Sequence, residues 1–209
     1  MSILHAVART ALLIALVVEP RLIDHIVAIC DYHVVGRSDI ARAETLIEAS
    51  VPTILDRDRL LAGGQDGKNA ILKELLMRHL AYRAAVRFQI GRDEAKAAAR
   101  RVLDEMKVRL GEDGLHELLK KTKMTESELA KEIEIASRAK LFIARQIDLS
   151  VELGKKRFYE RHRKLFPAEF SEEEERVVRV YRERLLDKWF RDSLSKADFR
   201  LLDKSFSVF

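Results

Sequence analysis

The apolar positions change their spacing once along the chain, near residue 36. Residues 26–30 form a short apolar run rich in β-branched side chains, and Val34 and Val35 resume the run after a turn. Ser38 then has the chemistry of a helix N-cap. The apolar residues beyond it recur at helical spacing, at Ile40, Ala43, Ile47 and Val51. The pattern predicts a hairpin over about 26–35, followed by a helix.

Helical periodicity then continues almost to the end of the chain. Pro52 is expected to end or kink the first helix, and residues 56–68, with three glycines, to form a loop. Capping boxes are predicted at Thr125 and at Ser171, each followed three residues later by Glu. No strand is expected within residues 70–150. Apolar stripes predict helices over about 70–90, 93–110, 114–122, 125–148, 152–165 and 171–194.

The last helix and the tail each carry a structural expectation. Trp189 shares one helix face with Val178, Tyr181 and Leu185, so we expect it to be buried against the N-terminal helices. The tail after residue 197 is too apolar to be free in water. An isolated two-stranded hairpin is marginally stable, so we expect residues 199–202 to add an edge strand to it.

The composition favours a mainly α protein with one core. Of the 209 residues, 47% are hydrophobic and 35% are charged, while only three are proline and eight glycine. The single cysteine, Cys30, excludes an internal disulfide, and its apolar surroundings predict a buried thiol. The net charge of +5 is a weak indication of nucleic-acid binding.

Residues 1–20 have the features of a secretory signal. They carry one positive charge, Arg9, and an apolar run over 11–18 that is too short to span a bilayer. No clear cleavage motif precedes Glu19-Pro20. An amphipathic or buried helix is the alternative. We expect an exported, periplasmic protein without stable membrane insertion.

The motifs of common enzymes and cofactor sites are absent from the sequence. It contains no dinucleotide-binding glycine motif, no P-loop and no zinc-protease motif. His25 and His33 could face each other across the hairpin. Cys30 and Asp31, as strand neighbours, are expected to point to opposite faces, which disfavours a metal site there. We therefore expect no catalytic residue, no metal and no cofactor.

Residues 155–164, KKRFYERHRK, form the strongest charge feature. Six Lys or Arg residues and one Glu give this segment a net charge of six minus one, or +5. With Phe158 and Tyr159 interleaved, it could contact nucleic acid. The simpler interpretation is a solvated helix face whose two aromatic rings turn inward, and we favour it because no nucleic-acid motif accompanies the segment.

The order of these segments resembles the SurA-type periplasmic chaperones, a trigger-factor-like class of peptide-binding module. The hairpin with its helix start (23–40) resembles that family's opening, and 70–106 and 122–147 resemble its next helices. Phe158, Tyr159 and His162 match its tyrosine-rich helix. The resemblance covers about residues 22–166, and less specifically the last helix and tail. Lys123-Met124 replaces a family glycine, and Gly154 stands where a glutamate is usual.

The resemblance implies a helical chaperone module whose small sheet is completed by the C-terminal helix and strand. Residues 1–20 would be the signal, 21–166 the SurA N-terminal-like domain, and 167–209 the segment that completes it. Many relatives carry a parvulin prolyl isomerase domain after the tyrosine helix. Such a domain needs on the order of 100 residues, and Pro167 runs almost directly into Ser171. The expected protein is therefore not an enzyme.

The expected function is ATP-independent binding of unfolded outer-membrane or secreted polypeptides, without nucleic acid. A homodimer formed by exchange of terminal elements is a further possibility. The alternatives are an isomerase-related protein whose activity is supplied elsewhere, and a helical nucleic-acid-binding protein using Lys155–Lys164. The candidate client-binding residues are apolar side chains on an expected shallow surface: Leu46, Ile54, Leu72, Leu76, Met77, Met106, Phe142 and Leu153.

Overall fold

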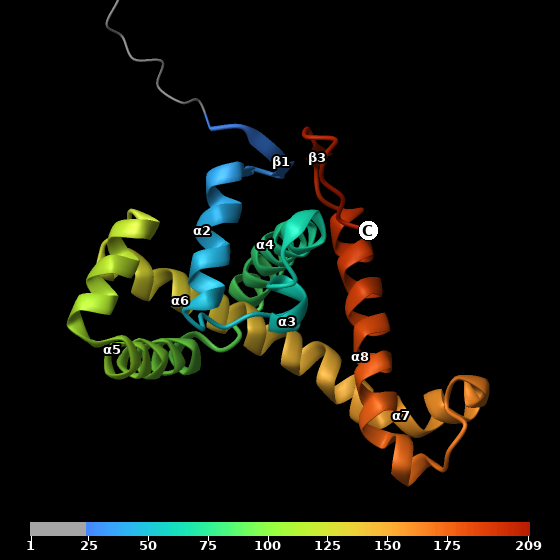
Figure 1. Cartoon of the computed structure of the whole chain (residues 1–209). Coiled ribbons are helices and arrows are strands. Elements are labelled where there is room, and N and C mark those ends of the chain that lie inside the picture. Colours follow the sequence, from blue (N-terminus) through green and yellow to red (C-terminus); the bar gives the residue numbers. More distant parts are fainter. Residues whose placement is uncertain (1–23) are drawn as a thin grey trace, which may run out of the picture.

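The computed structural model describes residues 24–209 and shows a mainly helical body with one small sheet (Figure 1). Strand β1 (Ile26–Cys30) pairs antiparallel with β2 (His33–Gly36) and with β3 (Phe199–Leu201). The strand order is β2-β1-β3. The predicted mainly α fold with a small sheet is confirmed, as are the hairpin and the added C-terminal strand. The expected signal at 1–20 lies outside the described residues.

Helices make up the rest of the body, and α6 crosses it from α5 to α7 (Figure 1). A π-helical turn (Ala144–Asp148) joins α6 to α7, and a 3₁₀ turn (Arg163–Leu165) follows α7. Residues 70–150, all described, contain no strand, as predicted. The α-helices are α2 (Arg37–Glu48), α3 (Arg57–Leu60), α4 (Gly64–Arg87), α5 (Arg92–Thr122), α6 (Glu126–Ile143), α7 (Leu149–Arg161) and α8 (Phe170–Leu194).

The start of α2 differs from the prediction. The N-cap is Gly36, two residues before Ser38, and the Asp39 carboxylate accepts a hydrogen bond from the Gly36 N–H at 2.9 Å. Ser38 instead donates from its hydroxyl to Asp24 at 2.5 Å. That bond holds the pKa of Asp24 below its usual value. Ser38 therefore fastens the segment before β1 to the helix.

Other helix ends follow the prediction only in part. The capping box of Thr125 and Glu128 is present, with the Thr125 N–H donating to Glu128 at 2.7 Å. Gly111, at φ 68°, breaks the helical backbone within α5, at the stop that was predicted between two helices. The Ser171 cap is wrong, because Glu169 already has the extended backbone of an N-cap. The predicted loop 56–68 contains α3 and the first turn of α4.

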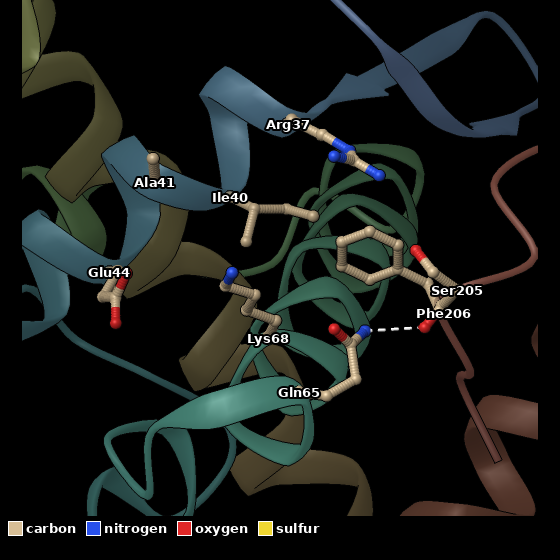
Figure 2. Close-up of a pocket in the computed structure, with 8 residues that line it drawn as sticks. All are labelled: Arg37, Ile40, Ala41, Glu44, Gln65, Lys68, Ser205 and Phe206. Atoms are coloured by element: carbon tan, nitrogen blue, oxygen red, sulfur yellow. Dashed lines mark hydrogen bonds between the residues drawn. The ribbon is translucent and has the colours of Figure 1, made fainter.

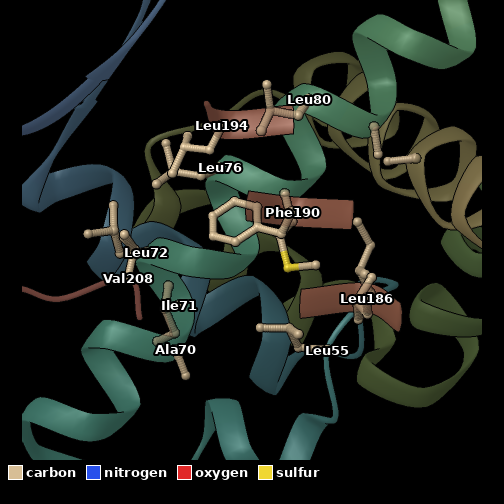
Figure 3. Packing of buried hydrophobic residues seen from close by; sticks show 14 of the residues in the cluster. Leu55, Ala70, Ile71, Leu72, Leu76, Leu80, Leu186, Phe190, Leu194 and Val208 are labelled. Atoms are coloured by element: carbon tan, nitrogen blue, oxygen red, sulfur yellow. The ribbon is translucent and has the colours of Figure 1, made fainter. Parts of the chain in front are cut away.

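Helix α4 lies at the centre of the main core, packed against α2, α6 and α8. Figure 3 shows Phe190 of α8 against this helix, with Leu186 and Leu194 one turn away on either side. A second apolar cluster joins α2, α5 and α6, and a third joins α7 to α8 around Phe158 and Phe166.

The expectation for Trp189 is met only in part. Its side chain packs against the main core and meets Phe142, with ring centroids 6.0 Å apart, but it is half-buried and not fully buried. The buried positions of α8 near it are Leu186, Phe190 and Leu194. The most buried line of α8 differs from the predicted stripe, because Val177 packs in the cluster with α7 while Leu186, Phe190 and Leu194 pack in the main core.

Three buried charges on α4 each meet a partner from a different element. The Lys73 Nζ lies 2.6 Å from the Asp187 carboxylate on α8. The fully buried Glu74 carboxylate accepts hydrogen bonds from the N–H groups of Ile54 and Leu55, the shortest at 2.9 Å. Arg78, which lies 3.6 Å from Glu74, contacts Glu132 of α6 at 2.8 Å.

The tail continues past β3 into the main core. The N–H of Leu202 donates to the Val27 carbonyl at 2.9 Å, which extends the pairing with β1. Figure 2 shows Phe206 beside Ile40 of α2, while Gln65 of α4 donates to the Ser205 carbonyl at 2.7 Å. The small hollow between them has a volume of about 180 Å³. Both ends of the described chain are thus joined in one body.

The two aromatic residues near the end of α8 are expected to differ in their contribution to stability. Phe190 is 0% exposed, so Phe190→Ala should cost about 3–5 kcal/mol of unfolding free energy. Trp189→Ala should cost clearly less, because its ring is partly in water. Urea unfolding of both variants measures the difference, and an equal loss would contradict it.

Removing the tail should expose the free edge of β1. Deletion of residues 197–209 takes away β3 and the buried side chains of Phe206 and Val208. We expect a lower melting temperature and faster aggregation, because unpaired strand edges pair with other chains. Thermal unfolding and light scattering measure both effects. An unchanged melting temperature would show that the tail is not structural.

The buried Glu74 carboxylate should matter more than an exposed glutamate of an ion pair. Glu74→Gln keeps the shape but replaces one charged acceptor with a donor that faces backbone N–H groups, at a cost of about 2–3 kcal/mol. Glu126→Gln is the control, since Glu126 and its partner Lys107 are 49% and 43% exposed, and it should cost about 1 kcal/mol or less. Urea unfolding distinguishes them, and equal losses would refute the proposed role of burial.

Candidate functional site

Seven of the eight expected client-binding residues are buried in the core and do not form a surface. Each is at most 4% exposed, because two of them, Leu46 and Met106, lie in the second apolar cluster and the other five lie in the main core. The expectation that they line a shallow surface is therefore corrected for this set: Leu46, Ile54, Leu72, Leu76, Met77, Met106 and Phe142.

The eighth residue, Leu153, lies on the surface together with Leu149. They are one turn apart on α7, and their side chains are 80% and 62% exposed. The opposite face of α7 is packed, since Val151, Phe158 and Tyr159 are buried. Two neighbouring leucines thus face solvent on a helix whose inner face is already filled.

The π-helical turn explains why these leucines face outward. Ile147 and Val151 continue the buried stripe from Ile143 at a spacing of four residues. A regular α-helix has 3.6 residues per turn, so the π turn supplies the extra residue that keeps this stripe inward. Leu149 and Leu153 then lie on the solvent side.

The packing of α7 on α8 keeps this face outward. A Cβ atom added to Gly154 would lie 2.6 Å from the Tyr181 hydroxyl, so glycine permits the close approach of the two helices. The rings of Phe158 and Tyr181 stack with centroids 4.5 Å apart. A larger residue at 154 would require the Tyr181 ring to shift.

The basic segment 155–164 adopts the simpler of its two interpretations. Phe158 and Tyr159 turn inward and are buried, so neither ring is open to stack on a base. Lys155 contacts Glu152 and Glu174 at 2.6 and 2.8 Å. These contacts neutralise part of the local charge, and they raise the pKa of Lys155.

A second open surface lies where α4, α5 and α6 meet. It is a broad hollow of about 840 Å³. Arg138 forms part of its wall, donating to the Ile90 carbonyl at 2.9 Å and lying over the Tyr82 ring at 5.8 Å. Phe88, the C-cap residue of α4, is 60% exposed and directly precedes Gln89, which lines the hollow. The remaining lining is mostly charged: Val86, Gln89, Arg92, Lys96 and Glu134.

The histidines of the hairpin are arranged differently from the expectation. His33 does not pair with His25 but stacks on His79 of α4, with centroids 4.4 Å apart and planes within 8°. Burial lowers the pKa of both rings, that of His79 to about 4. The residue missed by sequence reasoning is His79, because it lies on a helix far from the hairpin in the chain.

Comparisons with known proteins add no relative: no family model, no curated protein and no solved structure matches the chain. Within residues 24–209, no helix combines the length and the apolar character that a bilayer crossing requires.

Proposed function

We propose that this protein is an ATP-independent periplasmic chaperone that binds unfolded polypeptides. The observation that carries the proposal is the pair Leu149 and Leu153, apolar surface that the core does not use. The order of sequence motifs shared with SurA-type chaperones supports the same function. Unfolded outer-membrane or secreted chains are the proposed clients, and the proposed role is binding without catalysis.

The size of the exposed surface favours weak and reversible binding. Fully covering one leucine side chain contributes about 1.5–3 kcal/mol. Association itself costs about 4–15 kcal/mol in lost translational and rotational freedom. Two leucines therefore cannot hold a client alone, and contacts along the adjoining helices must add to them. Weak binding of many sequences through few shared apolar contacts is what a holding chaperone requires.

The charged hollow beside α4 is the proposed second contact for a client segment. Tyr82 and Val86 offer apolar surface, while Arg92, Lys96 and Arg138 give it an excess of positive charge over Glu134. Such a surface suits extended segments in which apolar and acidic side chains are mixed. No specific observation favours the isomerase alternative. The nucleic-acid alternative is not favoured either, because the aromatic rings of the basic segment are buried.

The leucine pair should decide how well the protein protects a client. Wild-type protein at stoichiometric amounts should suppress aggregation of a denatured outer-membrane β-barrel protein, measured by light scattering without ATP. Leu149→Ser combined with Leu153→Ser should lose at least half of this suppression, because it removes the apolar contact without disturbing buried groups.

The matched control is Val108→Ser, which changes a side chain of α5 that is 87% exposed and far from α7 in the chain. It should protect the client as the wild type does. Failure of the wild-type protein to suppress aggregation would refute the proposed function. Full protection by the double variant would refute the role of this face.

A further inference from the structure

The turn of the hairpin and helix α4 bring three metal-ligand side chains together. One donor atom each from Cys30, Asp31 and His79 lies within 4.8 Å of the other two. The Cys30 side chain is fully buried, and the other two are partly exposed. The set offers a sulfur, an oxygen and a nitrogen from two separate parts of the chain.

The backbone at Asp31 makes this arrangement possible. Side chains alternate between faces only while the chain remains extended, and Asp31 leaves the strand with φ 52°. Two hydrogen bonds to the C-terminal segment fix it, from the Asp31 N–H to the Asp198 carbonyl at 2.8 Å and from the Asp198 N–H to the Asp31 carboxylate at 2.9 Å. The expectation that Cys30 and Asp31 point to opposite faces is therefore wrong.

The His79 ring is prepared to act as a ligand. Its Nε2 atom is buried and has no hydrogen-bond partner within the described residues. Buried polar atoms are rarely left without a partner. A ring nitrogen without a hydrogen-bond partner is free to bind a metal, and imidazole is the commonest metal ligand in proteins.

We propose that Cys30, Asp31 and His79 form a binding site for a divalent transition-metal cation, with Zn²⁺ the best fit. Mixed thiolate, imidazole and carboxylate donors match the ligand preferences of zinc. Bonds of about 2.0–2.3 Å place tetrahedral donors roughly 3.3–3.8 Å apart, so the three side chains must move inward by about 1 Å. Three protein ligands leave one position for water.

Metal binding displaces the Cys30 proton and the Arg83 side chain. The Cys30 thiol releases its proton to solvent as the sulfur–metal bond forms, because the thiolate is the form that binds metal. Arg83 forms an ion pair with the Asp31 carboxylate, and its guanidinium must withdraw when the cation arrives. Removal of Arg83 should therefore strengthen the site.

Cobalt titration of the untagged, reduced full chain tests the proposal. Co²⁺ is the probe, because a tetrahedral thiolate site gives it visible bands and a near-ultraviolet sulfur-to-metal charge-transfer band. We expect one Co²⁺ per chain, displaced by Zn²⁺. Cys30→Ser should remove the charge-transfer band, and His79→Gln should weaken binding at least tenfold. His116→Gln, an exposed histidine of α5, is the control and should bind like the wild type.

Arg83→Gln keeps the test decisive even where Cys30→Ser fails to fold. This variant should bind Co²⁺ several-fold more tightly, because the cation that competes for Asp31 is gone, and circular dichroism reports its fold. An exposed adventitious site would not respond in this way. Absence of the charge-transfer band in the wild type, wild-type affinity in His79→Gln, or unchanged affinity in Arg83→Gln would each overturn the assignment. None of these outcomes depends on chaperone activity.

Discussion

The burial of α4 on almost every side is the constraint on which the rest of the structure depends. A helix in that position cannot leave a charged group unpaired, since an isolated buried charge is very costly. Lys73, Glu74 and Arg78 therefore each require a partner, and each finds one on a different element. Hydrophobic contact would permit several arrangements of the surrounding helices. The three charges favour one, because they match α8, the segment before α3, and α6 to separate positions along α4.

Much of the fold follows from local chemistry and was therefore predictable. The β-branched run before Cys30, the capping box at Thr125 and the helix break at Gly111 depend on neighbours in sequence. The pairing of residues 199–201 with the hairpin is a long-range contact. It could be predicted because an apolar tail and an incomplete sheet each need a partner. The predicted caps Ser38 and Ser171 are not the N-caps of their helices. Gly36 and Glu169, which precede them, already have the extended backbone of an N-cap.

The candidate surface was less predictable, because it depends on helix phase. A buried stripe predicted from sequence assumes a constant helical period, and the π turn at Ala144–Asp148 adds one residue to the helix and so changes which side chains face inward after it. Apolar side chains of similar character then separate into buried Val151 and exposed Leu153. The seven buried residues of the predicted set are large apolar residues of the kind that also line interaction surfaces, but in this fold they lie in the core. The proposed metal-ligand cluster depends on the positive φ of Asp31 and on His79, which lies about 50 positions after Cys30 in the chain. The spacing of apolar residues in the sequence predicts neither feature.

The central place of β1 in the sheet sets an order of events during synthesis. This strand is among the first described parts of the chain to be made, yet one of its edges is completed only by residues close to the end. Synthesis proceeds at about 5–20 residues per second, so the 169 positions from Cys30 to Phe199 keep this edge open for on the order of ten seconds or more. During that interval the nascent chain carries the same vulnerability as the unfolded proteins it is proposed to hold. The sheet therefore cannot be complete before Phe199–Leu201 have been made and can reach β1.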